Sequence, residues 1–175
     1  MITWRELYSK EKDVSFYIDH ISNHKIFLDS ILREKPSRTL EVGVGTSTFS
    51  IFLSHLGIDA FALDIDPAII EVAKRYCNKL NGNVNYITGN AFNLHESVSN
   101  VTYDVIFHQG LLEHFPDAEI AELLRQQLEI APIVVFSVPI ADYGKRDAGN
   151  ERLMSPSNWI KILQKHGFNI VEQYS

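Results

Sequence analysis

The stretch from Thr39 to Ser50 reads Thr-Leu-Glu-Val-Gly-Val-Gly-Thr-Ser-Thr-Phe-Ser, an apolar run that ends in two glycines and leads into a helical pattern. Such a run predicts a buried parallel strand whose carboxyl end bends around a ligand. Gly43 and Gly45 lack a Cβ, so they permit positive φ angles and let backbone N–H groups approach a bound molecule closely. We therefore expect a nucleoside-type ligand at this turn.

Glu41 is a carboxylate within the same otherwise apolar strand. Burying an ionised carboxylate without a partner costs several kcal/mol, roughly, so such groups are paired or hydrogen-bonded in proteins. The sequence thus predicts a cationic or hydrogen-bonding partner for Glu41. We expect it to hold either a positively charged end of the ligand, directly or through water, or the turn around that ligand.

Length and composition indicate one globular domain. The chain has 175 residues, of which 45% are hydrophobic and 22% charged, enough for one sizeable core. We predict a single domain over residues 1–175, with an N-terminal lid or helix over 1–35 and a sheet core over 36–175. The lone cysteine, Cys77, cannot form an internal disulfide or a pair of metal ligands, and we expect it to pack on a helix.

The charge pattern excludes several classes of protein. The net charge of −6 and the lack of a dense Lys/Arg run disfavour a nucleic-acid-binding protein. No apolar stretch reaches the ~20 residues that a membrane-spanning helix needs, and residues 1–10 do not resemble a signal peptide. We therefore expect a cytoplasmic protein that binds no membrane.

Strand-like and helix-like segments alternate along the rest of the chain. Helical spacing of apolar residues predicts one amphipathic helix from Asp13 to Arg33, on which His20 and His24 are interpreted as packed or solvated rather than as metal ligands. Apolar strands separated by helices indicate an open parallel sheet covered on both faces. After the strand at residues 39–42, further strands are predicted at Ala60–Ile65, Val84–Thr88, Tyr103–His108, Ile133–Val138 and Phe168–Tyr174.

The polar residues of chemical interest follow the ends of these strands. In open parallel sheets the ligand lies beyond the carboxyl ends, where the strand order reverses. Asp64 follows Gly45 by 19 residues, close to the ~20-residue interval at which a carboxylate binds both hydroxyls of a ribose. Asn90 follows the third strand, and His108, Gln109 and Gly110 follow the fourth. We expect all of them to converge on one ligand.

The glycine pattern separates kinds of nucleotide. A dinucleotide fingerprint needs a third glycine where this chain has Thr48, which disfavours an oxidoreductase that uses a nicotinamide cofactor. The Walker pattern of a nucleotide triphosphatase is also missing. An uncharged turn beside Glu41 suits a ligand with a cationic amino-acid end better than one with a diphosphate.

From residue 13 to residue 175 the sequence resembles the class I S-adenosylmethionine-dependent methyltransferases. The resemblance implies a Rossmann-like, doubly wound sheet that lacks the usual last antiparallel strand, with S-adenosylmethionine as cofactor and S-adenosylhomocysteine as product. It rests on Glu41–Gly45, Leu63–Pro67, Gly89–Ala91, Tyr103–Phe107 and Gly110–Phe115. The residues that it places around the cofactor are Glu41, Gly43, Val44, Gly45, Thr46, Ser47, Asp64, Ile65, Asn90, Ala91, His108 and Gln109.

Three departures from the family pattern have consequences. Ser47 stands where many relatives have another glycine, and Asn90 replaces an aspartate beside the adenine, so we expect weaker donor binding there. Relatives usually continue into an antiparallel seventh strand beside the fifth, whereas this sequence stops first. We expect either a shortened relative or a sheet that closes differently, for example through a homo-oligomer or another partner that covers the edge.

The resemblance implies in-line methyl transfer, for which positioning supplies most of the rate. His108 is the candidate catalytic residue, as a proton acceptor; the alternative is that its side chain only packs. Glu113 and His114 either face the acceptor or cap the next segment, and Tyr143 and Arg146, with Lys145 and Arg152, either recognise an acidic acceptor or are solvated. We expect a small-molecule acceptor; the alternatives are a catalytically idle binding module and, less favoured, an NAD-dependent oxidoreductase.

Overall fold

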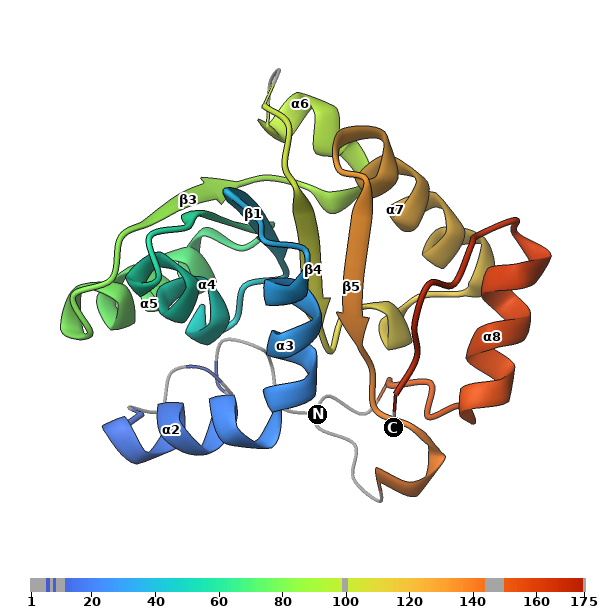
Figure 1. Ribbon diagram of the computed structural model, residues 1–175, viewed down its shortest axis with the longest axis horizontal. Helices are drawn as coiled ribbons and strands as arrows, with labels where there is room; N and C mark the ends of the chain where they lie inside the picture. The colour runs from blue at the N-terminus through green and yellow to red at the C-terminus, as the bar shows by residue number, and fades with distance from the viewer. Residues whose placement is uncertain (1–5, 7, 9–11, 99–100, 144–149, 175) are drawn as a thin grey trace.

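Five parallel strands form the centre of the molecule (Figure 1). The computed structural model describes residues 6, 8, 12–98, 101–143 and 150–174. The strands lie in the order β3-β2-β1-β4-β5, so β1 is central and the strand order reverses between β1 and β4. Their bounds are Arg38–Val42 for β1, Asp59–Asp64 for β2, Val84–Thr88 for β3, Val105–Gln109 for β4 and Ile133–Ser137 for β5.

Helices follow the strands as the sequence predicts, and local signals set their ends. Asp66 caps α5 by accepting the N–H of Ala68 at 2.9 Å, and Pro67 occupies the first turn. Ser155 and Pro156 start α8 in the same way. The helices are α2 Val14–Asn23, α3 Lys25–Arg33, α4 Thr48–His55, α5 Pro67–Lys79, α6 Leu94–Val98, α7 Asp117–Ile130 and α8 Pro156–Lys165, with short 3₁₀ turns η1 Ala91–Asn93, η2 Leu112–His114 and η3 Ala141–Tyr143.

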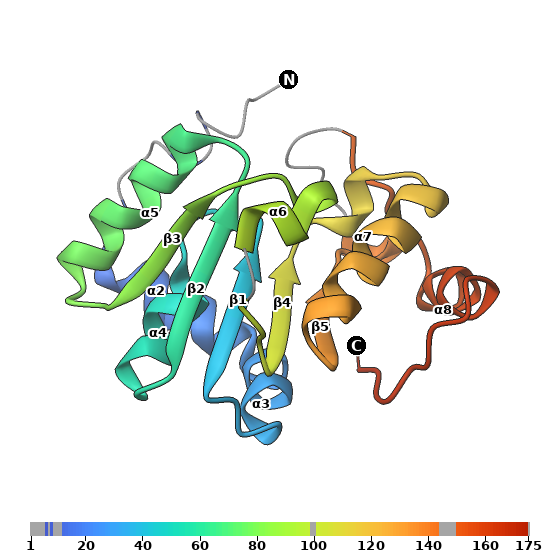
Figure 2. The same cartoon turned by 90° about the horizontal axis from the view of Figure 1, so that it is seen from above.

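Helices cover both faces of the sheet, as Figure 2 shows. On one face α3 and α4 pack against β4 through the fully buried rings of Phe27, Phe49 and Phe107. On the other face α6 and the end of α7 pack against β1 and β4, where Leu40 and Ile106 are buried. The predicted doubly wound fold is therefore confirmed, and its two cores hold the carboxyl ends of β1 and β4 rigidly side by side.

The predicted single helix from Asp13 to Arg33 is wrong in one respect, because it is broken at His24. This residue ends α2 and precedes α3 with φ −115° and ψ 28°. The carbonyl of His20 accepts both the backbone N–H of His24 at 3.2 Å and its Nδ1–H at 2.7 Å. The break lets α2 turn away to pack on α4, with His20 reaching Gln109 at the end of β4, while α3 packs on the face of the sheet (Figure 1).

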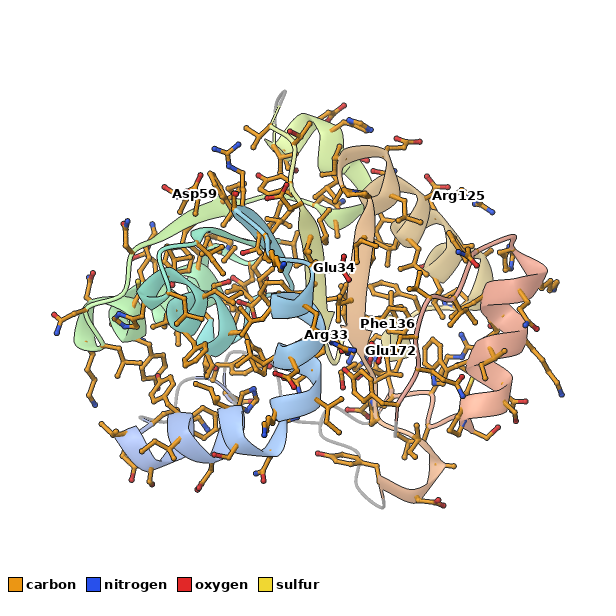
Figure 3. All side chains as sticks on the ribbon, in the orientation of Figure 1. Arg33, Glu34, Asp59, Arg125, Phe136 and Glu172 are labelled. Atoms are coloured by element: carbon orange, nitrogen blue, oxygen red, sulfur yellow. The ribbon has the colours of Figure 1, made fainter. Side chains whose placement is uncertain are left out.

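The predicted sixth strand, Phe168–Tyr174, is also wrong, since the structure assigns no strand to residues 168–174. A strand needs a neighbour with which to exchange backbone hydrogen bonds. Here a cavity lies between β5 and this segment, and Val171 is 76% exposed. A surface ion pair of 2.5 Å between Arg33 and Glu172 holds the segment near α3 (Figure 3). Among the described residues, β5 therefore pairs only with β4.

Two smaller findings concern the single cysteine and membrane-spanning helices. Cys77 is buried on α5 beside Tyr17 and Tyr76, which agrees with its predicted packing role. No helix among the described residues is long and apolar enough to cross a membrane.

Candidate functional site

The glycine turn after β1 is built from tight backbone geometry. The N–H of Gly43 donates to the carbonyl of Leu63 at 2.8 Å, which joins the ends of β1 and β2. Gly43 and Gly45 have φ angles of 74° and 49°, in the left-handed region that favours glycine. A Cβ at Gly43 would lie 3.3 Å from Leu111, and one at Gly45 would lie 3.0 Å from the ring of Tyr8. The turn geometry therefore favours glycine at both positions, and a side chain at either would press on a neighbour.

Ser47 has the backbone conformation that explains why relatives prefer glycine at its position. Its φ of 59° is left-handed, and the residue is fully buried as the N-cap of α4. Its hydroxyl accepts the phenolic O–H of Tyr86 at 3.1 Å rather than capping the helix. Next to it, the hydroxyls of Thr46 and Thr48 lie 2.8 Å apart. The turn is thus fixed by side-chain contacts that the serine adds.

Glu41 has its expected partner, and the partner is Ser50 on α4. One carboxylate oxygen accepts the Ser50 hydroxyl at 2.6 Å and the Ser50 N–H at 3.3 Å. The residue is only 5% exposed, and burial raises the pKa of Glu41 to about 7, against the lowering effect of the Ser50 bonds. Of the two predicted roles, this geometry supports holding the turn and α4 together.

Asp64 lies at the carboxyl end of β2, directly beside the glycine turn. Its carboxylate accepts the N–H of Asp66 at 2.9 Å. Burial raises the pKa of Asp64, while backbone N–H groups, including that of Val44 in the turn, act in the opposite direction. The following residue, Ile65, is a large apolar side chain that is 67% exposed. A carboxylate and an apolar surface thus lie together where a ribose and a base are expected.

Asn90 and Ala91 lie at the end of β3, as predicted. The N–H of Gly89 donates to the carbonyl of Asp64 at 3.0 Å, so this loop is tied to the end of β2. The Asn90 side-chain oxygen already accepts the N–H of Phe92 at 2.9 Å and caps η1, which begins at Ala91. An amide oxygen has a second lone pair, so one acceptor site remains for a ligand amino group.

The residues after β4 divide into a buried and an accessible part. His108 is fully buried and stacks on Phe136 with ring centroids 5.5 Å apart, and neither ring nitrogen has a hydrogen-bond partner among the described residues. Burial lowers the pKa of His108 to about 3. This placement supports the packing alternative, and its role as proton acceptor stays a prediction.

Gln109 points the other way, toward α2. Its Oε1 lies 3.0 Å from Nε2 of His20, which sits among the rings of Phe16, His24 and Phe49. Burial, and then His24, lowers the pKa of His20 to about 4, so the ring is neutral at pH 7. The pair of histidines is therefore packed, as interpreted from the sequence, and His20 connects α2 to the end of β4.

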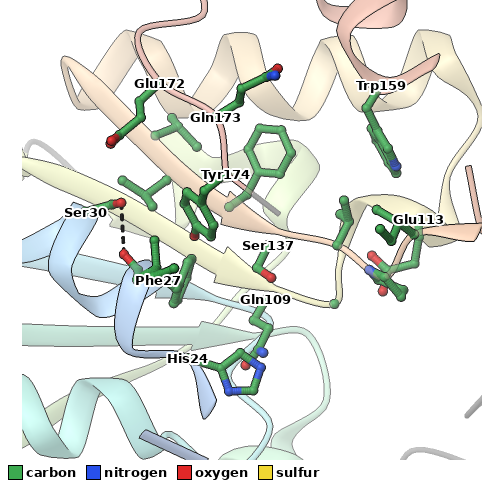
Figure 4. A pocket seen from close by; sticks show the side chains of 18 of the residues that line it. His24, Phe27, Ser30, Gln109, Glu113, Ser137, Trp159, Glu172, Gln173 and Tyr174 are labelled. Carbon is green, nitrogen blue, oxygen red and sulfur yellow. Dashed lines mark hydrogen bonds between the residues drawn. The ribbon is translucent and has the colours of Figure 1, made fainter. Parts of the chain in front are cut away.

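A cavity of about 1430 Å³ opens beside this point, between α3, β5, α8 and the segment 168–174 (Figure 4). Gln109, Gly110, Glu113 and His114 line it, and so does Tyr8, whose ring lies against Gly45 of the glycine turn. Glu113 is 2% exposed, with one carboxylate oxygen 3.8 Å from Nε2 of His114. The two residues predicted either to face the acceptor or to cap a segment therefore reach the cavity wall.

The residues predicted to recognise an acidic acceptor have different environments. Arg152 donates to Asp117 and to the carbonyl of Phe115, each at 2.5 Å, so it fastens η2 to α7. Tyr143 is half exposed and lines the cavity. Arg146 and Lys145 lie outside the described residues.

Sequence reasoning missed three residues that the structure brings to this site: Tyr8, His20 and Ser50. Ser50 carries the only signal that could have been used, because it falls on the first turn of the helix that follows the strand of Glu41. The contacts of Tyr8 and His20 link distant parts of the chain, and no spacing in the sequence indicates them.

Comparison with known proteins identifies the family of the chain. Residues 39–130, more than half of the chain, match the family model described as "Methyltransferase domain". The mitochondrial ubiquinone biosynthesis O-methyltransferase of Schizosaccharomyces pombe is 32% identical over 95 residues; the match covers 50% of this chain and 34% of that protein. This chain therefore matches about a third of its curated relative.

Solved structures share the fold. Magnesium protoporphyrin IX methyltransferase from Synechocystis PCC 6803, with bound SAH, has a TM-score of 0.71 at 16% identity over 97% of this chain and 84% of its own. A putative O-methyltransferase from Nostoc punctiforme also has a TM-score of 0.71, at 17% identity over 98% of this chain and 56% of its own. With the motifs, the sheet order and the family match together, the chain belongs to the class I S-adenosylmethionine-dependent methyltransferases.

Proposed function

We propose that this protein transfers a methyl group from S-adenosylmethionine to a small-molecule acceptor bound in the cavity beside β4 and β5. One observation carries the proposal. The carboxylate of Asp64, the glycine turn and Gln109 meet at one edge of the sheet, and the cavity opens next to them. A donor site and an acceptor site thus adjoin at the strand-order reversal, where open sheets of this kind bind their ligands.

The described residues fit the donor. Asp64 supplies a carboxylate for the ribose hydroxyls, and the exposed Ile65 offers an apolar surface to the adenine. Asn90 retains one acceptor lone pair for the adenine amino group, with Ala91 beside it. The turn from Gly43 to Ser47, backed by Glu41, takes the methionine portion. When bound, the donor supplies a methyl group on a sulfonium, which a nucleophile can displace in line.

The acceptor wall supports a small molecule. Glu113, His114 and Tyr143 line the cavity. Among the described residues that line it, basic side chains do not form a dense patch. The relative from Schizosaccharomyces pombe is named for O-methylation in ubiquinone biosynthesis, which supports an oxygen acceptor in a small molecule. Arg146 and a proton-accepting His108 stay predictions of the same proposal, and so does a cytoplasmic location.

Calorimetric titration with S-adenosylmethionine, S-adenosylhomocysteine and NAD tests the donor. Asp64→Ala should weaken binding of S-adenosylhomocysteine by roughly 1 to 3 kcal/mol, because charge-assisted hydrogen bonds to the ribose are lost. Asp59→Ala is the matched control, since Asp59, labelled in Figure 3, lies at the opposite end of the same strand, where it pairs with Arg38 at 2.8 Å. Binding of NAD alone would overturn the proposal, and equal affinities of both variants would show that Asp64 is misassigned.

A methyl-transfer screen over phenols, amines and carboxylates then tests the acceptor. Turnover of a small molecule is the expected result. Donor binding without turnover of any acceptor would favour the catalytically idle module instead. Light scattering in the same buffer measures whether the protein forms a homo-oligomer, as predicted from the sequence.

A further inference from the structure

Tyr8 lies directly on the glycine turn, although it is far from the turn in the sequence. Its ring carbons and hydroxyl approach to between 3.0 and 3.1 Å of the position that a Gly45 Cβ would occupy. The same side chain packs against a buried apolar cluster that includes Val44 and Ile69. Tyr8 is therefore held in place from one side by the core and presents its other side to the end of β1.

Helix α2 is fastened to the same end of the sheet by independent contacts. The N–H of Lys12 donates to the hydroxyl of Tyr76 at 3.0 Å. Within α2, His20 contacts Gln109, and the His20 ring packs on Phe49 with ring centroids 5.0 Å apart. The first contact ties the residues before α2 to α5, and the second places His20 of α2 at the carboxyl end of β4.

We propose that Tyr8 is a donor-binding residue that forms the outer wall of the site at the methionine end, and that His20 is a positioning residue that aims the Gln109 amide at the same ligand. This inference rests on the proposed function, because it takes S-adenosylmethionine as the ligand of the turn. An aromatic ring provides a large apolar contact at low conformational cost and excludes water from the sulfonium.

The position of Tyr8 also defines the competing reading. A ring that rests on the turn either borders the ligand or occupies part of its place. The two interpretations predict opposite changes in ligand affinity when the Tyr8 ring is removed, since removing a wall weakens binding and removing a plug strengthens it. The wall is favoured because Tyr8 lines the same open cavity as Gln109, while its ring packs against the core cluster.

Titration of the full chain with S-adenosylhomocysteine decides between them. We expect Tyr8→Ala to weaken affinity about tenfold through lost apolar contact, and Tyr8→Phe to keep most of the affinity. His20→Ala should weaken affinity about threefold through disorder of Gln109, and His20→Gln, which retains a side-chain N–H, should restore most of it. Ile18→Ala is the matched control on α2, since Ile18 is 60% exposed.

Ligand-free thermal unfolding of each variant separates binding from folding. Because Tyr8 packs on the core cluster and His20 on Phe49, both alanine variants should unfold at a lower midpoint, whereas Tyr8→Phe should unfold close to the unaltered protein; affinities are therefore compared at a temperature at which every variant is folded. If the unaltered protein binds and Tyr8→Ala leaves the affinity unchanged or makes it tighter, the wall is refuted while the proposed function stands. If the unaltered protein does not bind S-adenosylhomocysteine at all, the proposed function fails and this inference fails with it.

Discussion

Glu41→Gln is the substitution that tests the electrostatics beneath the glycine turn. The carboxylate is 5% exposed and accepts two hydrogen bonds from Ser50. Glutamine has almost the same shape and keeps a side-chain oxygen that can accept the Ser50 hydroxyl, but it carries no charge at any pH. The substitution therefore removes the titration of Glu41 while leaving the packing nearly intact.

The expected magnitude follows from the pKa. Burial raises the pKa of Glu41 from 4.5 to about 7, a difference that corresponds to roughly 3 kcal/mol at ~1.4 kcal/mol per unit. Between these two pH values the folded state binds a proton that the unfolded state has already lost. The contribution of Glu41 to stability is thus fully present below pH 4.5 and is lost as the pH rises toward 7.

The assay is urea unfolding of both proteins at a series of pH values from 4.5 to 8. The variant should gain stability relative to the unaltered protein as the pH rises, by roughly 3 kcal/mol in total. The difference between the two proteins is the diagnostic quantity, because His20 and His108, whose pKa values burial lowers, change the stability of both proteins in the opposite direction. A difference that stays constant across this range would refute the reasoning.

Glu71→Gln provides the matched control. Glu71 makes a surface ion pair of 2.8 Å with Lys74, and its side chain is 65% exposed. Because exposed pairs contribute little, we expect a change of less than about 1 kcal/mol at every pH. A pH-dependent gain as large as that of Glu41→Gln would show that the effect is not specific to the buried site.

Three further predictions concern the same region. Gly43→Ala should destabilise the fold by about 1 to 3 kcal/mol in urea unfolding, because φ is 74° and the added Cβ lies 3.3 Å from Leu111; an unchanged midpoint would contradict the strain. Phe49→Ala removes a ring that is 1% exposed between Phe27 and Phe107, so we expect a loss of about 3 to 5 kcal/mol, and a loss below about 1 kcal/mol would mean that the core rearranges freely. His108→Leu should keep the affinity for S-adenosylhomocysteine and shift acid unfolding to lower pH, since the unfolded state gains a proton below pH 6.5 that the buried imidazole, with a pKa of about 3, does not accept; a folded variant without methyl transfer would instead support a catalytic His108.

The sequence by itself determined the five-stranded sheet and the strand ends at which we propose the donor site. Apolar runs and helix caps such as Asp66-Pro67 act locally, so strands, helices and the positions of Asp64 and Gln109 at strand ends could be predicted from residue order. Because parallel strands bring their carboxyl ends to one edge, these residues had to converge once the sheet formed.

Tertiary structure alone decided which of these side chains are accessible at the strand ends and which residues support them. Alternation along β4 turns His108 into the interior and leaves Gln109 accessible, and a shift of one residue in the strand reverses that choice. A strand at Phe168–Tyr174 would need a neighbouring strand with which to pair, and the local sequence pattern does not encode that neighbour. Contacts such as Tyr8 on Gly45 and His20 at Gln109 join distant segments, so they exist only after the sheet has packed, and no local spacing can indicate them.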